Sequence, residues 1–166
     1  MRITRRSLTH LAVCAAAGAL VVVSARAAEE RSGPWFGNLP RIKGAKVIVD
    51  YASLGCFHDE RHRLTFDDRP SVTIEKYSRD KDGKWQGPEA IGQFALTAED
   101  LAGLDRLLRF YRAKPGGGCT TVDSASLEWQ EEGKQVAAES FSDESCHADS
   151  PESKRLTFRM LIRRLK

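Results

Sequence analysis

The stretch LTAEDLAGLDRLLRFY, residues 96–111, predicts the helix around which the other elements are arranged. Thr97 can cap its first turn while Asp100 reaches back to the Thr97 amide, a variant of the capping box with Asp in place of Glu. Leu96 and Leu101 occupy the two positions of a hydrophobic staple. Apolar side chains then recur at helical spacing, which predicts a helix with one buried face: Leu101, Leu104, Leu107, Leu108 and Tyr111.

Strand-like segments precede this helix. In residues 45–51, Val47, Val49 and Tyr51 alternate onto one face, as expected of a half-buried strand. Further strand signals follow, and the last of them is short: residues 63–66, 71–77 and 91–96.

After the helix, residues 119–142 predict a long hairpin with a two-residue turn at Glu132-Gly133. This turn pairs Trp129 with Val136 and Leu127 with Ala138, so that all four side chains face one core. Phe141 falls on the opposite face in this register. We therefore expect a bulge near residues 139–141, which could shift the pairing by one residue.

Residues 150–152, Ser-Pro-Glu, are a good start for a C-terminal helix, because they combine a cap, a proline in the first turn and an early acid. Phe158, Leu161, Ile162 and Leu165 continue at helical spacing. A run of strands with helices inserted late favours an α+β fold. We expect an antiparallel sheet of about five strands in the order β-β-β-(β)-α-β-β-α, with two helices packed on one face.

The N-terminus predicts export. Arg2, Arg5 and Arg6 precede an apolar stretch, residues 11–23, which is too short to span a bilayer stably. Ala25-Arg26-Ala27 then supplies the small-x-small pattern of a signal peptidase site. We expect residues 1–27 to be a cleaved signal peptide, residues 28–44 a loose N-terminal lead-in, and residues 45–166 a single α+β domain. The protein would be periplasmic, with the twin-arginine route possible and no stable membrane insertion of the mature chain.

Removal of the signal peptide changes the charge of the protein. The full chain has 26 basic and 23 acidic residues, and residues 1–27 hold four of the basic residues and none of the acidic ones. The mature chain therefore has a net charge of −1. A nearly neutral domain gives no support to nucleic-acid binding, which needs a clustered basic face.

Cys119 and Cys146 fall opposite each other when the Glu132-Gly133 register is extended to the open end of the hairpin. Side chains paired across antiparallel strands are close enough for a disulfide after slight adjustment. An exported domain with cysteines at matched ends of one hairpin is typical of disulfide bonding. We expect this bond to add about 3 kcal/mol of stability.

SLGCFHDERH, residues 53–62, leaves two alternatives open. If residues 59–61 are a hairpin tip, His58 and His62 face each other and could hold a metal, with Cys56 as a third ligand. In one extended strand the two histidines would lie about 13 Å apart and could not share an ion. The other alternative is a solvated turn with Cys56 free or paired between chains.

Two features suit partner binding. Trp85 lies in a polar segment, where an exposed aromatic side chain could serve a partner, although it could equally fold back on the sheet edge. Arg155, Arg159 and Arg163 recur along the last helix and could meet an acidic protein or an anionic lipid headgroup, although a solvated helix face has the same pattern. Serine-hydrolase, phosphate-loop and dinucleotide motifs are absent from the sequence, so it suggests neither catalysis nor a cofactor.

The motifs GCFH (55–58), CTTVD (119–123) and SC (145–146), with an LxxLxxLL helix (101–108) between them, resemble small exported bacterial proteins of unassigned function. That resemblance covers about residues 45–165 and implies a disulfide-bonded α+β domain. The layout of the elements is also similar to that of emfourin-type bacterial proteinase inhibitors. We expect a non-catalytic periplasmic binding protein that contacts another envelope protein, and the most concrete version of this role is an inhibitor or immunity-type protein of an envelope enzyme. The alternative is a periplasmic metal-binding or metal-sensing protein.

Overall fold

The computed structural model describes residues 33–55, 58–147 and 154–165 of the chain. All the helices and strands described below belong to the compact unit Pro34–Lys166. Within the described residues, no helix is both long and apolar enough to cross a membrane.

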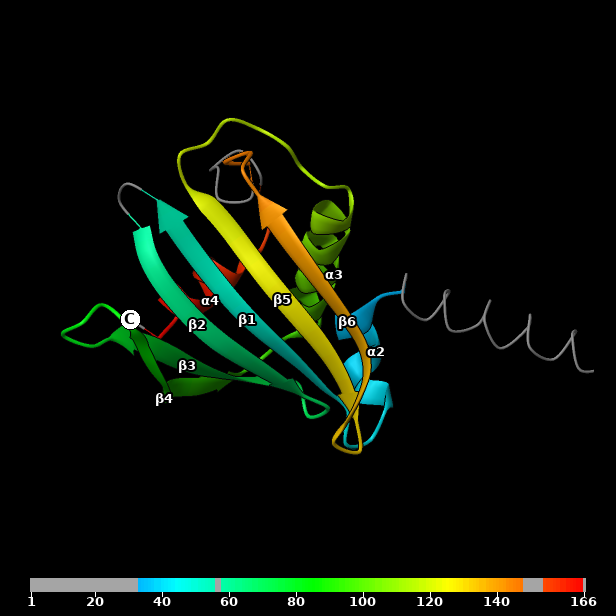
Figure 1. Ribbon diagram of the computed structural model, residues 1–166. Coiled ribbons are helices and arrows are strands. Elements are labelled where there is room, and N and C mark those ends of the chain that lie inside the picture. Colours follow the sequence, from blue (N-terminus) through cyan, green and yellow to red (C-terminus); the bar gives the residue numbers. More distant parts are fainter. Residues whose placement is uncertain (1–32, 56–57, 148–153, 166) are drawn as a thin grey trace, which may run out of the picture. The chain divides into compact units, whose positions relative to one another are not determined.

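Six antiparallel strands form one sheet in the order β4-β3-β2-β1-β5-β6 (Figure 1). The α+β prediction is confirmed, but the expected number of strands was too low. The fourth segment, predicted only as a short strand, is a full edge strand that begins at Trp85. The strands are β1 (Lys46–Gly55), β2 (His58–Asp67), β3 (Ser71–Arg79), β4 (Trp85–Ala95), β5 (Val122–Glu131) and β6 (Lys134–Asp143).

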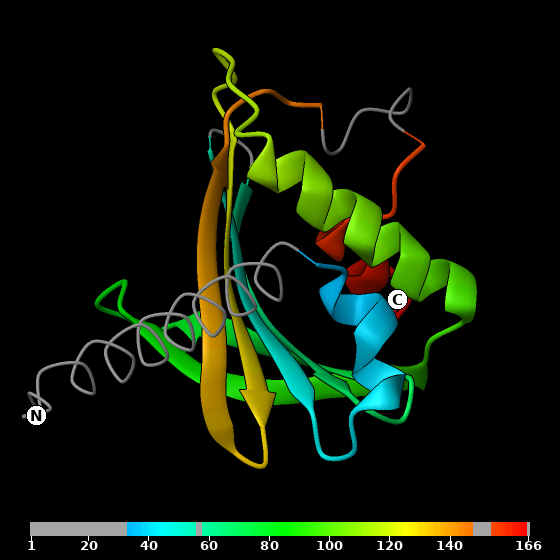
Figure 2. The same cartoon turned by 90° about the vertical axis from the view of Figure 1, so that its right-hand side faces the viewer.

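The buried side chains alternate along the strands and define an inner face. Helices α2 (Trp35–Asn38), α3 (Ala98–Arg112) and α4 (Phe158–Arg163) lie on the same side of the sheet (Figure 2). Leucines of α3 share one buried cluster with the inner face of the sheet and with α4. Among the fully buried members of this cluster are Val47, Val49, Leu64, Phe66, Ile74, Leu104, Leu107 and Leu161.

Helix α3 forms as the sequence predicts. The Thr97 side chain accepts a hydrogen bond from the Asp100 amide, and the Asp100 carboxylate accepts one from the Thr97 amide, which completes the capping box. Both residues of the staple, Leu96 and Leu101, are buried. The helix therefore begins and packs where its local sequence directs.

The expected loose lead-in is wrong for its described part. Residues 35–38 form α2, and Leu39–Arg41 form the 3₁₀ helix η1. Trp35, Phe36 and Leu39 are all buried in the core. Burial of three large apolar side chains outweighs the Gly- and Pro-rich composition of this segment.

The β5–β6 hairpin has the predicted turn but a different bulge. Glu132 and Gly133 both have positive φ, as a type I′ turn requires. The register shifts between Trp129 and Gln130, so Trp129 pairs with Ala137 rather than Val136, which is 50% exposed. Leu127 pairs with Glu139, not with the expected Ala138. The bulge thus lies closer to the turn than residues 139–141, and it turns Phe141 toward the core.

Helix α4 begins later than the sequence indicates. Thr157 is its N-cap, and the Thr157 hydroxyl accepts a hydrogen bond from the Met160 amide. Residues 154–157 are not helical, and the expected start at residues 150–152 lies outside the described residues. The apolar spacing was read correctly: Phe158, Leu161 and Ile162 are buried, and Leu165 packs against the core.

Candidate binding site on the outer face of the sheet

The side chains opposite the core form the outer face of the sheet, and the strand registers arrange them in rows. In one row, Ala52 of β1 lies between Arg61 of β2 and Ser124 of β5. In the next row, Asp50 lies between Arg63 and Ser126. In both rows the residue on β2 is an arginine, while the residues on β1 and β5 have smaller side chains.

This difference in size produces a hollow of about 370 Å³, which we call the outer hollow. Small side chains form part of its floor, and the end of the β3–β4 hairpin reaches out on the side of the sheet away from α3 (Figure 2). Trp85, at the start of β4, lines the hollow. The lining of the hollow includes Asp50, Ala52, Leu54, Arg61, Trp85, Ser126 and Ser140.

Trp85 is fixed in place by its neighbours. The Arg79 guanidinium carbon lies 4.1 Å from the centre of the Trp85 ring, a cation–π contact. Arg79 in turn donates two hydrogen bonds to the Asp59 carboxylate, at 2.7 and 2.9 Å, and one to the Gly83 carbonyl at 2.6 Å. The hydrogen bonds from Arg79 lower the pKa of Asp59. The Trp85 side chain is therefore half-buried, and its contact with Arg79 fixes its position.

A second chain of contacts fixes Arg61. Its guanidinium carbon lies 4.6 Å from the centre of the Tyr77 ring. The Tyr77 hydroxyl donates to Asp50 at 3.1 Å, and Arg63 donates to both oxygens of Asp50, at 3.1 and 3.0 Å. Burial, with the nearby charge of Asp50, raises the pKa of Tyr77, so its hydroxyl stays protonated and donates at neutral pH.

The ion pairs beside the outer hollow involve Arg63 and Arg79 but not Arg61, and Glu75 adds a second negative charge near Arg63. Asp50 is paired with Arg63, and Asp59 is paired with Arg79. Arg61 makes its cation–π contact with Tyr77, but within the described part of the chain it has no carboxylate partner. The hollow is therefore lined by a guanidinium that has no ion-pair partner among the described residues, together with the Trp85 ring and the 44% exposed Leu54 side chain.

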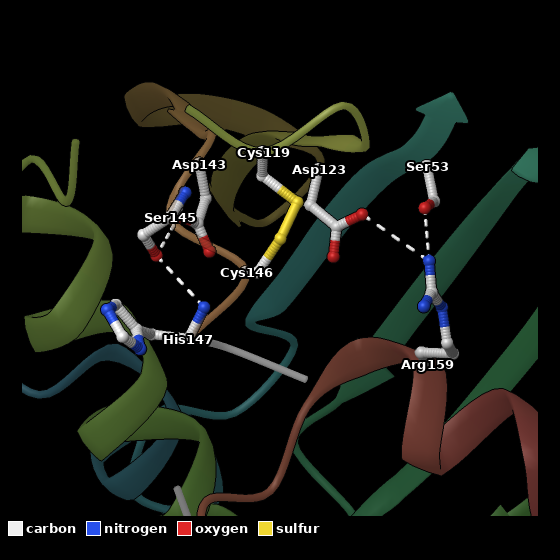
Figure 3. Close-up of a disulfide and its surroundings, with 8 residues drawn as sticks. All are labelled: Ser53, Cys119, Asp123, Asp143, Ser145, Cys146, His147 and Arg159. Atoms are coloured by element: carbon white, nitrogen blue, oxygen red, sulfur yellow. Dashed lines mark hydrogen bonds and ion pairs between the residues drawn. A yellow bond between two sulfur atoms is a disulfide. The ribbon is translucent and has the colours of Figure 1, made fainter. Parts of the chain in front are cut away.

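The Cys119–Cys146 disulfide is present, as predicted, with Cα atoms 5.7 Å apart (Figure 3). It lies beyond the ladder, because β5 begins at Val122 and β6 ends at Asp143. The Cys119 amide donates to the Glu144 carbonyl at 2.8 Å, which holds the two flanking segments together. The bulge shifts the β5–β6 pairing by one residue from the expected register. The turn after Asp143 nevertheless brings Cys146 next to Cys119.

The three arginines of the C-terminal region do not form a common surface, so the predicted stripe is wrong. Arg159 is 7% exposed, donates a hydrogen bond to Ser53 and forms an ion pair with Asp123 at 3.5 Å (Figure 3). Arg155 lies before α4 and stacks over Phe110 at 4.2 Å. Arg163 is exposed. Arg159 lies on the buried face of α4, where Ser53 and Asp123 are its polar partners.

Asp143, Ser145 and His147 lie near the disulfide but are not arranged for nucleophilic catalysis (Figure 3). The Ser145 hydroxyl donates to the Asp143 carboxylate at 2.5 Å and accepts from the backbone amide of His147 at 3.1 Å. A serine nucleophile would instead donate to an imidazole. These contacts stabilise the turn that follows β6.

The hairpin tip proposed for residues 59–61 is wrong, because β2 is one continuous strand from His58 and Gly55 pairs with His58. His58 and His62 are four residues apart on this strand, or about 13 Å, which is too far to share an ion. His62 is buried opposite Tyr51. Cys56 lies outside the described residues, within which no group of three metal-ligating side chains occurs.

Sequence reasoning singled out Trp85 as a candidate but not the residues that line the hollow with it. The sequence alone places Arg61 in a hairpin tip at residues 59–61. It assigns Asp50 and Tyr77 to strands without predicting a role in a site. A sequence signal for Arg61 does exist. Residues 62, 64 and 66 of β2 are buried, so the residues that alternate with them, 59, 61 and 63, point to the outer face. Comparison of the sequence with protein-family models and with curated proteins gave no match.

Proposed function

We propose that this protein is a non-catalytic binding protein of the periplasm that contacts another envelope protein through its outer hollow. The observation that carries the proposal is the fixed position of Trp85 beside this hollow. Its ring is held by Arg79, which is itself held by Asp59. Tryptophan, tyrosine and arginine supply much of the binding energy in protein interfaces, and all three types occur together here.

The location of the protein rests on two supporting features. The first is the basic, apolar and small-residue pattern of residues 1–27, which is typical of a cleaved export signal. The second is the Cys119–Cys146 disulfide, since such bonds persist in oxidising compartments. Cell fractionation with N-terminal sequencing tests this location. We expect a periplasmic protein that begins at residue 28, and a cytosolic protein with residues 1–27 intact would contradict it.

The most concrete form of the proposal is an inhibitor or immunity-type protein for an envelope enzyme. Such proteins bind with little change in backbone conformation, and a surface fixed before binding loses less entropy in the complex. The contacts of Trp85 and Arg61 are already formed without a partner. This arrangement supports a rigid binding surface on the outer face.

The test is capture of partners from periplasmic extract with the wild-type protein and two variants. Trp85→Ala removes the ring beside the hollow. Met160→Ala is the matched control, because Met160 is a 48% exposed apolar residue on α4. We expect a defined protein to be retained by the wild type and by Met160→Ala, and retained about tenfold less by Trp85→Ala, a loss of about 1.4 kcal/mol.

Equal capture by Trp85→Ala and the wild type would count against the outer hollow as the binding site. An enzyme captured in this way is then assayed with added wild-type protein. Inhibition that Trp85→Ala fails to reproduce supports the inhibitor role, whereas unchanged activity limits the proposal to binding. The thermal unfolding of each variant is measured first, so that loss of capture is not confused with loss of the fold.

A further inference from the structure

We infer that the outer hollow receives an acidic segment of the partner protein, with a carboxylate paired to Arg61 and a neighbouring apolar side chain against Trp85 and Leu54. This inference rests on the proposed function and adds the chemistry of the partner. It is carried by the charge, the geometry and the size of the hollow.

The charge comes from Arg61. The other two arginines beside the hollow are neutralised, Arg63 by Asp50 and Arg79 by Asp59. Arg61 has no carboxylate within the described chain, although it is held half-buried against Tyr77. A partly desolvated guanidinium gains most from a carboxylate that a ligand brings with it.

The geometry leaves the donors of Arg61 available. A cation–π contact uses the charge and the face of the guanidinium and none of its five N–H groups. The Tyr77 ring is itself fixed through its hydroxyl, which donates to Asp50. Arg61 is therefore held in position without using the N–H groups that would pair in a fork with a carboxylate.

The apolar part of the hollow lies next to this charge. Leu54 is 44% exposed, and Trp85 is held by Arg79 alongside it. The Ser126 and Ser140 hydroxyls bond to each other at 2.8 Å on the floor and can also bond to the backbone of a ligand. About 370 Å³ is near the lower end for ligand pockets, which suits one or two side chains of a partner.

The test is a titration of ¹⁵N-labelled protein, purified from the periplasm with its disulfide intact, followed by NMR chemical shifts. The probes are acetyl-Gly-Asp-Phe-Gly-amide and its Asn analogue, each up to about 10 mM. We expect shifts at Ala52, Arg61, Trp85 and Ser126, and binding of the Asp peptide at least tenfold tighter than binding of the Asn peptide. Equal binding of the two peptides, or no shifts at these residues, overturns the inference.

Three arginine variants make the test specific. Arg61→Gln keeps most of the side chain but removes its charge, and we expect it to abolish the preference for the Asp peptide. Arg61→Lys keeps the charge without the fork and should retain part of the preference. Arg69→Gln, an exposed arginine in the β2–β3 turn, is the control and should bind as the wild type does. Unchanged core shifts show that each variant is folded.

N-acetylmuramic acid, a sugar that carries a carboxylate, is the third probe. If it binds at Arg61 more tightly than the Asp peptide, the partner is a glycan and the inference of a protein segment falls. The proposed function has a separate outcome. If Trp85 is needed to capture a protein but the Asp and Asn peptides bind equally, the binding role stands and only the acidic partner is excluded.

Discussion

Asp105, in the middle of α3, holds the backbone of Phe36 in α2. The Phe36 amide donates to one carboxylate oxygen at 3.0 Å, and the Gly37 amide donates to the other at 2.8 Å. Burial raises the pKa of Asp105, and the two amides oppose that shift. A segment 69 residues away in the sequence is thus tied to the central helix by one side chain.

Replacement of this carboxylate should loosen α2. Asp105→Ala leaves two backbone amides without their acceptor, and we expect the free energy of unfolding to fall by about 2–3 kcal/mol. Asp105→Asn keeps one acceptor and should cost less. Urea denaturation measures both values, and hydrogen exchange of the Phe36 and Gly37 amides shows whether α2 is the affected element. A loss of stability with unchanged exchange at these amides would contradict the role given to Asp105.

Asp100 gives the protein a defined pH dependence. Its pKa is lowered to about 2, first by the hydrogen bond from Arg164 and then by those from Thr97. Because the folded-state pKa lies below the unfolded value of 3.8, the contribution is present above pH 4 and is lost as the pH falls toward 2. We expect Asp100→Asn to cost about 1–2 kcal/mol at pH 7.

The measurement is urea denaturation of the wild type and Asp100→Asn between pH 2 and pH 7. The difference between the two proteins should shrink steadily below pH 4. A difference that stays constant across this range would show that the capping geometry, rather than the charge, accounts for the effect. Glu99→Gln is a suitable control, because Glu99 lies in the same helical turn and its ion pair with Arg106 is exposed to solvent.

The disulfide should contribute about 3–4 kcal/mol, the value expected for a loop of this length. We expect the Cys119→Ala/Cys146→Ala variant to lose this amount while it retains its far-UV circular dichroism, because the core lies between the sheet and α3. Chemical denaturation of the oxidised protein and of the variant gives the difference. A cost below about 1 kcal/mol would mean that the flanking segments are already ordered in the unfolded chain.

Substitutions at Arg159 and Arg163 test the contribution of the buried ion pair, because the two residues lie on the same helix but only Arg159 is buried. Arg159→Met leaves the Asp123 carboxylate buried without its arginine, and we expect a loss of about 3 kcal/mol. Arg163→Met changes an exposed residue of the same helix and should shift stability by less than about 0.5 kcal/mol. Thermal unfolding distinguishes the two. Similar effects from both substitutions would contradict the burial of Arg159.

Local signals made some elements predictable. Helix α3 has its cap, staple and apolar face within one continuous stretch, so Thr97, Asp100 and the leucines define it without reference to the rest of the chain. The Glu132-Gly133 turn is equally local, since its glycine accepts the positive φ that a type I′ turn needs. These predictions needed no knowledge of distant contacts.

Other features depend on contacts that the sequence does not display. Asp59 and Arg61 resemble turn residues, and they lie in β2 because its partners on β1 extend to Gly55. Arg159 of α4 has a charged side chain but is buried, and it contacts Ser53 of β1 and Asp123 of β5. The outer hollow is the least predictable feature, since it requires the registers of several strands at once.

The bond between Cys119 and Cys146 also affects what proteolysis can do to the protein. It closes β5, the turn and β6 into a covalent ring. A protease that cleaves the exposed turn at Glu132-Gly133 would leave two polypeptides still joined through sulfur, with β5 paired to β1 and β6 paired to β5. A nick at this site would therefore appear on a reducing gel but not on a non-reducing one.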